Sequence, residues 1–182
     1  TSLKILRIIK DQHKDNWEKF LSTSTKSSVE SLLKSEGIYS IFENVKGRNM
    51  MYLVCTLHPE HCFHPTYASW GYVWDLRRDP EPFLNLSVNE LKANLKKISP
   101  KALRVLKTNK APVVLDKKFA LKEKAYSELD LETILKRAKL VRNSENFCKN
   151  IQIINREAAE EKAQTQTQED LLPEETLYEK FI

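Results

Sequence analysis

The chain has 182 residues, of which 41% are hydrophobic and 30% are charged, a balance typical of a folded globular domain rather than a disordered segment. With 3 Gly it lacks the glycine-rich loops that hold phosphates in nucleotide-binding folds, and no apolar run approaches the roughly 20 residues that cross a bilayer. The formal net charge of +5 is modest, so the distribution of the charges is more informative than their sum.

The N-terminal part of the chain has the spacing of two helices. Apolar side chains recur at every third or fourth position over residues 2–21, and basic residues interrupt them, which favours an amphipathic helix over a signal peptide. A polar Ser/Thr stretch then leads to a second expected helix over Val29–Ser35, which Gly37 closes.

Four segments in the middle of the chain are expected to be strands. Met51–Thr56 and Trp70–Leu76 are short, rich in aromatic and β-branched residues, and bounded by turn residues. Arg104–Lys107 and Pro112–Leu115 follow as two further strands around a turn at residues 108–110.

Three later helices are expected: from Ser87 to just before Pro100, over Glu128–Val141, and over Ser144–Ala163. Ser87 and Glu90 have the spacing of a capping box, in which each residue satisfies a free amide of the other. Asp130 is placed to cap the next helix. The polar, low-complexity segment Thr165–Asp170 is expected to be a mobile loop.

The cysteines and the local charges indicate the compartment and the kind of partner. Three cysteines without a CxxC pair do not make a disulfide framework, which favours a reducing cytosol. Residues 104–142 contain 11 Lys and Arg against 5 Asp and Glu, whereas residues 157–182 contain 2 Lys against 8 acids. The basic segment points to a polyanionic or carboxylate-rich partner; the alternative is a solvated, lysine-rich surface.

Four residues of metal-binding type lie close together in the sequence: His58, His61, Cys62 and His64. Pro59 and Pro65 are expected to keep this backbone extended, so that alternate side chains point apart. We therefore expect a loop at a strand edge here, without a metal site. A Cys–His hydrolase is not expected either, because no acid is placed to orient the histidine.

Trp70, Tyr72 and Trp74 alternate along one strand and therefore share one face. Such a face can stack nucleic-acid bases, but we favour the alternative that it packs in the core. Tyr67 and Phe63, in the preceding loop, are better placed to be exposed.

Five segments follow one another along the chain: HPTYASWGYVWDL (His64–Leu76), RRDPEPFLNLSVNELKANL (Arg77–Leu95), VLKTNKAPVV (Val105–Val114), LKRAKLVRNSENF (Leu135–Phe147) and LYEKFI (Leu177–Ile182). In this order they resemble the exodeoxyribonuclease I family of 3′→5′ nucleases specific for single-stranded DNA. Ala111 stands where the family has Cys. The resemblance covers roughly residues 50–182, and SLKILRIIK (Ser2–Lys10) is similar to the last helix of the family's nuclease domain.

The resemblance implies an α+β fold, with a small antiparallel SH3-like barrel flanked by helices. Residues 1–36 would be the helical tail of the nuclease domain and a linker, residues 37–127 the barrel with one inserted helix, and residues 128–182 a C-terminal helical extension. In the family, four acidic residues and a histidine hold two magnesium ions in a nuclease domain that precedes this region. This chain is therefore expected to have no catalytic residues, metal ions or other cofactors of its own.

The expected setting is the bacterial cytoplasm, where the parent enzyme degrades single-stranded DNA in repair and recombination. We expect a monomer without membrane contact. The candidate phosphate-binding residues are cations at turns and strand ends: Arg77, Arg78, Lys107, Lys110, Lys117 and Lys118. Lys110 is the strongest of them, since it falls within a loop that resembles the family's.

The resemblance also implies a docking site for the acidic C-terminal tail of single-stranded-DNA-binding protein. Arg142 matches the arginine that captures the terminal carboxylate, Leu135 matches a pocket residue, and Lys122 lies on the segment that lines the pocket. Asp116 and Leu121 depart from the family's residue types. The alternative function is a protein-interaction module that binds acidic C-terminal peptides and has no DNA affinity of its own. A free-standing enzyme would need an acid or histidine cluster, which the sequence does not display.

Overall fold

The computed structural model describes residues 25–45 and 47–169, together with residues 10, 11, 14, 17, 18, 21 and 23. The few described residues of the first expected helix are helical, and the rest of that helix lies outside the described residues. The segment Leu177–Ile182, which contributes to the family resemblance, also lies outside them.

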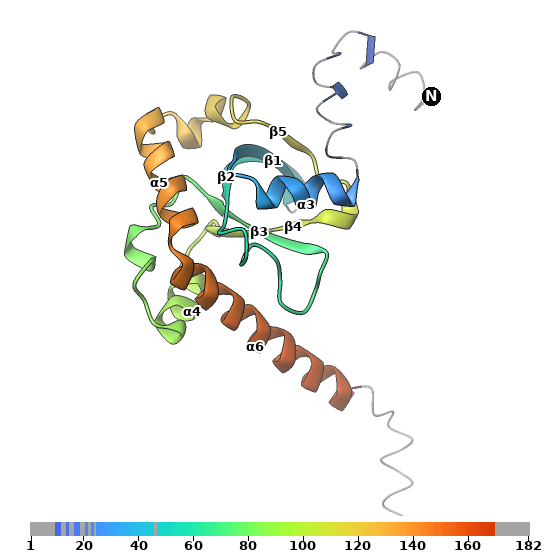
Figure 1. Cartoon of the computed structure of the whole chain (residues 1–182), viewed down its shortest axis with the longest axis vertical. Coiled ribbons are helices and arrows are strands. Elements are labelled where there is room, and N and C mark those ends of the chain that lie inside the picture. The colour runs from blue at the N-terminus through green and yellow to red at the C-terminus, as the bar shows by residue number, and fades with distance from the viewer. Residues whose placement is uncertain are drawn as a thin grey trace, which may run out of the picture.

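Five strands form one antiparallel sheet (Figure 1): β1 (Ile38–Val45), β2 (Arg48–Thr56), β3 (Trp70–Asp75), β4 (Leu103–Lys107) and β5 (Val114–Asp116). Their order across the sheet is β4-β3-β2-β1-β5. Together with the helices around it, this sheet confirms the expected α+β class. The strands all fall within Ile38–Asp116, while the expected division into three parts stays a prediction.

The sheet of the expected SH3-like barrel is open and does not close into a barrel among the described residues. β4 pairs with β3 at one edge, and β5 pairs with β1 at the other, and no pairing joins β4 to β5 among the described residues. Between them the chain passes through the 3₁₀ turn Thr108–Lys110 and through Ala111, whose φ is +43°. With five and three residues, these two edge strands offer few ladder hydrogen bonds with which to close a barrel.

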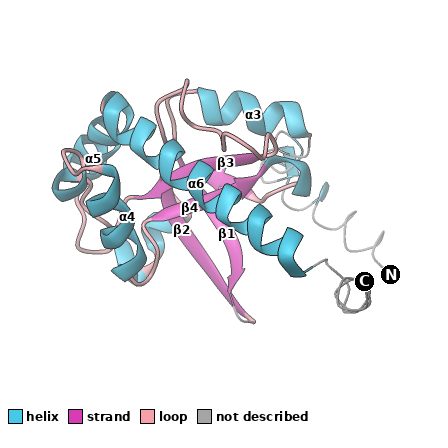
Figure 2. Cartoon of the chain, turned by 90° about the horizontal axis from the view of Figure 1, so that it is seen from below, coloured by secondary structure: helices cyan, strands magenta, loops and turns pink. Residues whose placement is uncertain are grey.

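A long hairpin of β1 and β2 extends beyond the layer of helices (Figure 2). Its turn includes Gly47, whose φ of +79° is the left-handed conformation that favours glycine. The outer half of the hairpin exposes apolar side chains, including Phe42 and Met50. The sequence pattern indicated only that the helical spacing of apolar residues ends near Tyr39, and it did not predict β1. The residues of the hairpin do not alternate between apolar and polar in the way a half-buried strand does.

In the continuously described part of the chain, residues 25–45 and 47–169, four α-helices surround the sheet: α3 (Lys26–Lys34), α4 (Val88–Lys97), α5 (Leu131–Asn143) and α6 (Glu145–Glu169). The N-terminal caps predicted for α4 and α5 are confirmed, whereas α3 ends at Lys34 with Ser35 as its C-cap, so the expected closure by Gly37 is wrong. The Ser87 hydroxyl accepts from the amide of Glu90, whose carboxylate accepts from the amide of Ser87, and Asp130 accepts from the amide of Thr133 over 2.6 Å. A mobile loop was expected over Thr165–Asp170. This expectation is wrong for residues 165–169, because α6 continues to Glu169.

The core lies between the sheet and the helices, with Trp74 at its centre. The rings of Phe83 and Phe147 pack edge-on against Trp74, with centroids 5.6 and 5.5 Å away. On another part of the sheet, α3 packs so closely that a Cβ at Gly71 would lie 2.2 Å from Leu33. Among the described helices, none combines the length and the continuous apolar surface that a bilayer-spanning segment needs.

All three cysteines are free and buried, which gives a prediction about their reactivity. Burial raises the pKa of Cys62 and of Cys148 to about 11, and it also raises the pKa of Cys55. The thiolate is the reactive form, so at pH 8 we expect a disulfide reagent to modify the folded chain at least about a hundredfold more slowly than the urea-unfolded chain. Rapid labelling of even one thiol in the folded chain would contradict this.

Candidate functional site

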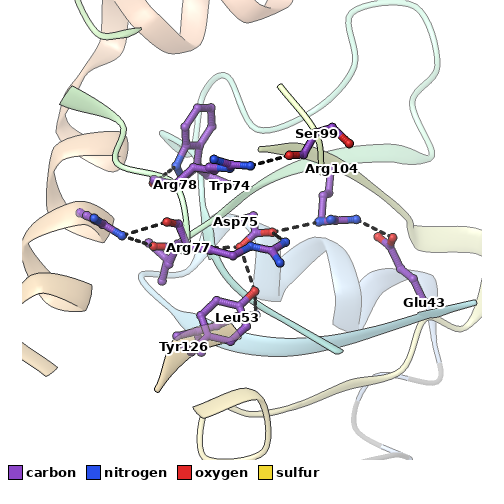
Figure 3. Close-up of polar contacts among 11 residues, drawn as sticks. Glu43, Leu53, Trp74, Asp75, Arg77, Arg78, Ser99, Arg104 and Tyr126 are labelled. Atoms are coloured by element: carbon purple, nitrogen blue, oxygen red, sulfur yellow. Dashed lines mark hydrogen bonds and ion pairs between the residues drawn. The ribbon is translucent and has the colours of Figure 1, made fainter. Parts of the chain in front are cut away.

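A buried carboxylate lies at the end of β3, and Figure 3 shows the groups around it. Asp75 has no solvent exposure, and the Arg77 guanidinium donates to its Oδ2 over 2.7 Å. The Tyr126 hydroxyl donates to Oδ1 over 2.8 Å and accepts from the Leu53 amide over 2.9 Å. The Nε of Arg104 lies 3.6 Å from Oδ2. Two cations and one hydroxyl therefore compensate the buried negative charge.

Arg104 extends this network across the sheet to β1. Its Nη1 donates to a carboxylate oxygen of Glu43 over 2.8 Å, and its guanidinium lies 3.2 Å from the centroid of the Tyr52 ring. The Arg104 side chain is only 8% exposed. Burial raises the pKa of the Tyr126 hydroxyl above its usual range, so this group stays protonated and donates to the carboxylate at neutral pH. The network thus joins the strands to one another and stabilises the fold.

Both arginines that were predicted to contact phosphates have protein partners. The Arg77 guanidinium is paired with the buried carboxylate, and the Arg77 carbonyl accepts from Arg137 over 3.1 Å. Arg78 donates to the carbonyl of Ser99 over 2.6 Å, and its own carbonyl accepts from the Trp74 indole over 3.0 Å. Both arginines therefore stabilise the fold through these contacts. Phosphate binding at these two positions stays a prediction.

A second arrangement lies at the other end of β3, where a cation contacts a half-buried aromatic ring that packs against an exposed one. Lys107 places its Nζ 4.9 Å from the centroid of the Trp70 ring, and the Tyr67 ring lies 4.8 Å from that of Trp70. Lys107 is exposed, and Tyr67 is 36% exposed. We call Tyr67, Trp70 and Lys107 the aromatic platform. An exposed ring beside a flexible cation can stack a base and neutralise its phosphate.

His64 is buried and stabilises the loop that carries Tyr67 of the aromatic platform. Its Nδ1 accepts from the amides of Thr66 and Tyr67 over 3.0 and 3.1 Å, and its ring lies 4.6 Å from that of Tyr67. Burial lowers the pKa of His64, so the imidazole is neutral at pH 7 and can keep accepting these two hydrogen bonds. The loop before β3 is thereby fixed with Tyr67 facing solvent.

The alternating aromatic residues of β3 divide between core and surface. Tyr72 and Trp74 are buried, which confirms the core interpretation for them, whereas Trp70 is half-buried at the platform. Tyr67 is exposed, as expected for the preceding loop, and Phe63 is half-buried. Trp70 is less buried than Tyr72 and Trp74 because it lies at the start of β3, at the margin of the sheet.

The six cations predicted to contact phosphates do not form one patch. They lie in three places: Arg77 and Arg78 after β3, Lys107 and Lys110 at the end of β4 and the turn after it, and Lys117 and Lys118 after β5. Trp70 pairs with Lys107, and β3 runs for six residues, about 20 Å, so the first two groups lie at opposite ends of one strand. β5 lies at the other edge of the sheet, which separates the third group from both.

A cavity of about 870 Å³ opens between β1, β5, the end of α3 and α5. Two of the three residues predicted for peptide docking line it, namely Leu135 and Arg142, whereas Lys122 does not. Leu135 is 49% exposed, a large apolar side chain at the surface of a concave site. Lys139 and Glu36 also line the cavity, and neither was among the residues predicted for docking. Lys139 could have been found, since it lies one helical turn before Arg142 on the same face.

The Arg142 guanidinium already binds the C-terminal end of α3. Its Nη1 donates to the Ser35 carbonyl over 2.7 Å and to the Thr56 hydroxyl over 2.6 Å, and its Nη2 donates to the Lys34 carbonyl over 3.0 Å. A cation is favourable there because the last carbonyls of a helix carry partial negative charge. Its Nε lies 3.3 Å from the Glu36 carboxylate, which is itself largely exposed. An incoming carboxylate at this site would therefore compete with Glu36.

The order of the strands, the inserted helix and the helices that follow define an α+β domain built on an open antiparallel sheet. The chain matches the family model of the exonuclease I SH3-like domain over residues 13–157, and it belongs to that family. A comparison with curated protein sequences finds no match.

Solved structures with the same fold include several of exonuclease I. The enzyme from Methylocaldum szegediense is 18% identical with a TM-score of 0.60, and the match covers 82% of this chain and 34% of the other. A complex of exonuclease I with SSB-Ct is 14% identical with a TM-score of 0.60, covering 84% and 34%. The E. coli enzyme with single-stranded DNA is 16% identical with a TM-score of 0.61, covering 85% and 35%. The chain thus spans about a third of the length of these proteins.

Proposed function

We propose that this chain is the single-stranded-DNA-handling and partner-docking region of a bacterial 3′→5′ exodeoxyribonuclease that acts in repair and recombination. Magnesium-dependent hydrolysis would be carried out by residues outside this chain. Two findings support the proposal, the membership of the exonuclease I SH3-like domain family and the similarity of the fold to an exonuclease I bound to single-stranded DNA. The observation in this molecule that carries it is the aromatic platform.

The platform suits a single strand better than a duplex. A single strand presents unpaired bases that can stack on Tyr67, and its phosphates can pass Lys107 and Lys110 without any reading of sequence. The electrostatic part of such binding releases counterions, so the affinity falls with salt in proportion to the number of phosphates that the protein neutralises. Strand grip of this kind would contribute processivity to a nuclease.

Replacing Lys107 and Lys110 together with Ala is expected to weaken binding to a labelled single-stranded oligonucleotide and to reduce the salt slope by about 1.4, or about 0.7 for each phosphate that is no longer neutralised. Tyr67→Ala is expected to lower the affinity about tenfold and to leave the slope unchanged, since stacking carries no charge. Fluorescence anisotropy over a series of salt concentrations measures both effects.

The matched control for the lysine pair is Lys96→Ala with Lys97→Ala, two exposed lysines in the last turn of α4. This control removes the same formal charge, so it shows the effect of net charge alone. An identical loss of affinity and slope in the control and in the platform variant would argue against a localised DNA site. Negligible DNA binding by the native chain at low salt would contradict the DNA-handling role outright.

The cavity supports a second function for the same chain, the docking of an acidic C-terminal peptide. Leu135 offers an apolar contact, and Arg142 and Lys139 offer cations in the same concave site. Such a site suits a peptide that ends in a large apolar residue with a free carboxylate, since a guanidinium can hold the carboxylate while the pocket takes the side chain. Binding of this peptide without any DNA affinity would favour the interaction-module alternative.

A further inference from the structure

The loop between β2 and β3 makes a tight turn where an extended backbone was expected. The His61 amide donates to the His58 carbonyl over 2.9 Å, which closes a turn with Pro59 at its second position. The expectation that Pro59 keeps this segment extended is therefore wrong. Proline presets a backbone dihedral that suits the second position of common turns, so it favours a turn here.

The turn brings three side chains of metal-binding type together. One potential ligand atom from each of His58, Glu60 and His61 lies within 4.8 Å of the others. The other two residues of the predicted cluster are directed elsewhere. Cys62 is buried and donates its thiol hydrogen to the Pro59 carbonyl over 3.1 Å, and His64 supports the aromatic platform.

His61 has the arrangement of an imidazole prepared for a metal. Its Nδ1 lies 3.1 Å from the side-chain oxygen of Gln152 on α6, a geometry in which Nδ1 carries the hydrogen and donates it. Its Nε2 is buried and makes no hydrogen bond with any described residue. The nearest carboxylate oxygen, from Glu145, is 3.6 Å away, which is within ion-pair distance but beyond hydrogen-bond length. Metal-bound histidines characteristically donate the hydrogen of the other ring nitrogen to a protein oxygen, which fixes the tautomer.

We propose that His58, Glu60 and His61 bind a divalent transition-metal ion of the zinc class, with water completing the coordination. Two imidazoles and one carboxylate suit zinc and do not suit magnesium, which prefers oxygen ligands alone. Neighbouring ligands around a tetrahedral zinc ion lie about 3.4 Å apart, so the three side chains must close by a small amount. Glu60 is exposed and His58 is half-buried, which leaves both free to adjust their side-chain rotamers toward His61.

The metal would brace the β2–β3 loop at the point where the loop contacts α6. Gln152 already joins the two, because its oxygen faces His61 and its amide donates to the Phe63 carbonyl over 3.2 Å. The same loop continues directly into Tyr67 and Trp70 of the aromatic platform. Binding of the ion would therefore stabilise the segment that presents these rings.

The test is a calorimetric titration of the chain with Zn²⁺, together with thermal unfolding in the presence and absence of the ion. We expect one zinc ion per chain, a higher midpoint of unfolding when zinc is present, and no response to Mg²⁺. His58→Gln and Glu60→Gln should each weaken zinc binding at least about tenfold. Both positions are solvent-accessible, so these variants should fold. The matched control, Glu132→Gln in the exposed first turn of α5, should bind zinc as the native chain does.

Cobalt as a spectroscopic probe identifies the ligands. We expect the visible absorption of Co²⁺ held by nitrogen and oxygen, without the near-ultraviolet band of a cobalt–thiolate bond. A thiolate band would overturn the proposal, since it would place the ion at a cysteine. Equal zinc affinity in the native chain and the His58→Gln/Glu60→Gln double variant would overturn it too. So would the absence of zinc binding, which would leave His61 facing Glu145 alone.

Discussion

Replacing Asp75 with Asn is expected to lower the free energy of unfolding by about 3–5 kcal/mol, the usual effect of breaking a buried ion pair from one side. The substitution keeps the size of the side chain and removes its charge. Arg104 is almost fully buried and lies beside this carboxylate, so its charge would lose a buried partner. The hydroxyl of Tyr126 would also face an amide instead of a carboxylate. Urea denaturation of the native and variant chains measures the difference.

Glu43→Gln is the matched control, because it removes the more exposed partner of the same arginine. We expect this change to lower the free energy of unfolding by less than about 1 kcal/mol, as for other solvent-accessible ion pairs. Comparable effects of the two substitutions would mean that the buried position of Asp75 contributes nothing beyond an ordinary surface pair. Normal stability of the Asp75→Asn variant would contradict the importance assigned to the network.

Replacing Leu135 with Asp is expected to weaken the binding of a peptide that ends in an acidic stretch and Phe by about 30-fold or more, the size of effect seen at interface hot spots. The substitution removes the apolar contact and introduces a repulsive charge. Leu135 is half exposed on α5, so the fold should tolerate the change. Arg142→Lys should also weaken binding, since a single ammonium group cannot both hold the end of α3 and face an incoming carboxylate as the guanidinium does. Anisotropy with the labelled peptide measures both.

Glu36→Gln should have the opposite effect and strengthen peptide binding several-fold. This carboxylate lies 3.3 Å from the Arg142 Nε in the cavity, where it competes with the peptide terminus. A peptide with an amidated C-terminus is the control, and it should bind weakly to the native chain and to the variant. If Leu135→Asp leaves the affinity unchanged, the cavity is not the docking site.

The elements that the sequence predicted correctly are those specified by neighbouring residues. The cap at Asp130 and the capping box of Ser87 and Glu90 are complete within four residues of chain, so the helix starts follow from local hydrogen bonding alone. The strands β2 and β3 are short aromatic and β-branched runs bounded by turns, and both were predicted to within a few residues. β1 was missed, because its outer half is exposed and lacks a clear alternation.

The candidate sites depended on contacts between distant residues, and here the predictions were less complete. Leu135 and Arg142 both line the cavity, as expected for two residues seven apart on one helix. No sequence pattern indicated that the Arg77 guanidinium would turn inward to Asp75, or that Arg142 would already hold the end of α3. A cation near a turn can face solvent or a buried carboxylate, and the choice depends on which acid the fold places beside it.

The sequence by itself therefore determined the family, the α+β class and most of the helices and strands, since each of these depends on local spacing and order. Only the tertiary structure decided that β4 and β5 remain on opposite edges, that Lys107 meets Trp70 across two strands, and that Gln152 reaches His61 from a helix far along the chain. The physical reason is the same in each case. Strand pairing and side-chain burial bring together residues that are widely separated in the sequence, and their energies depend on that three-dimensional proximity.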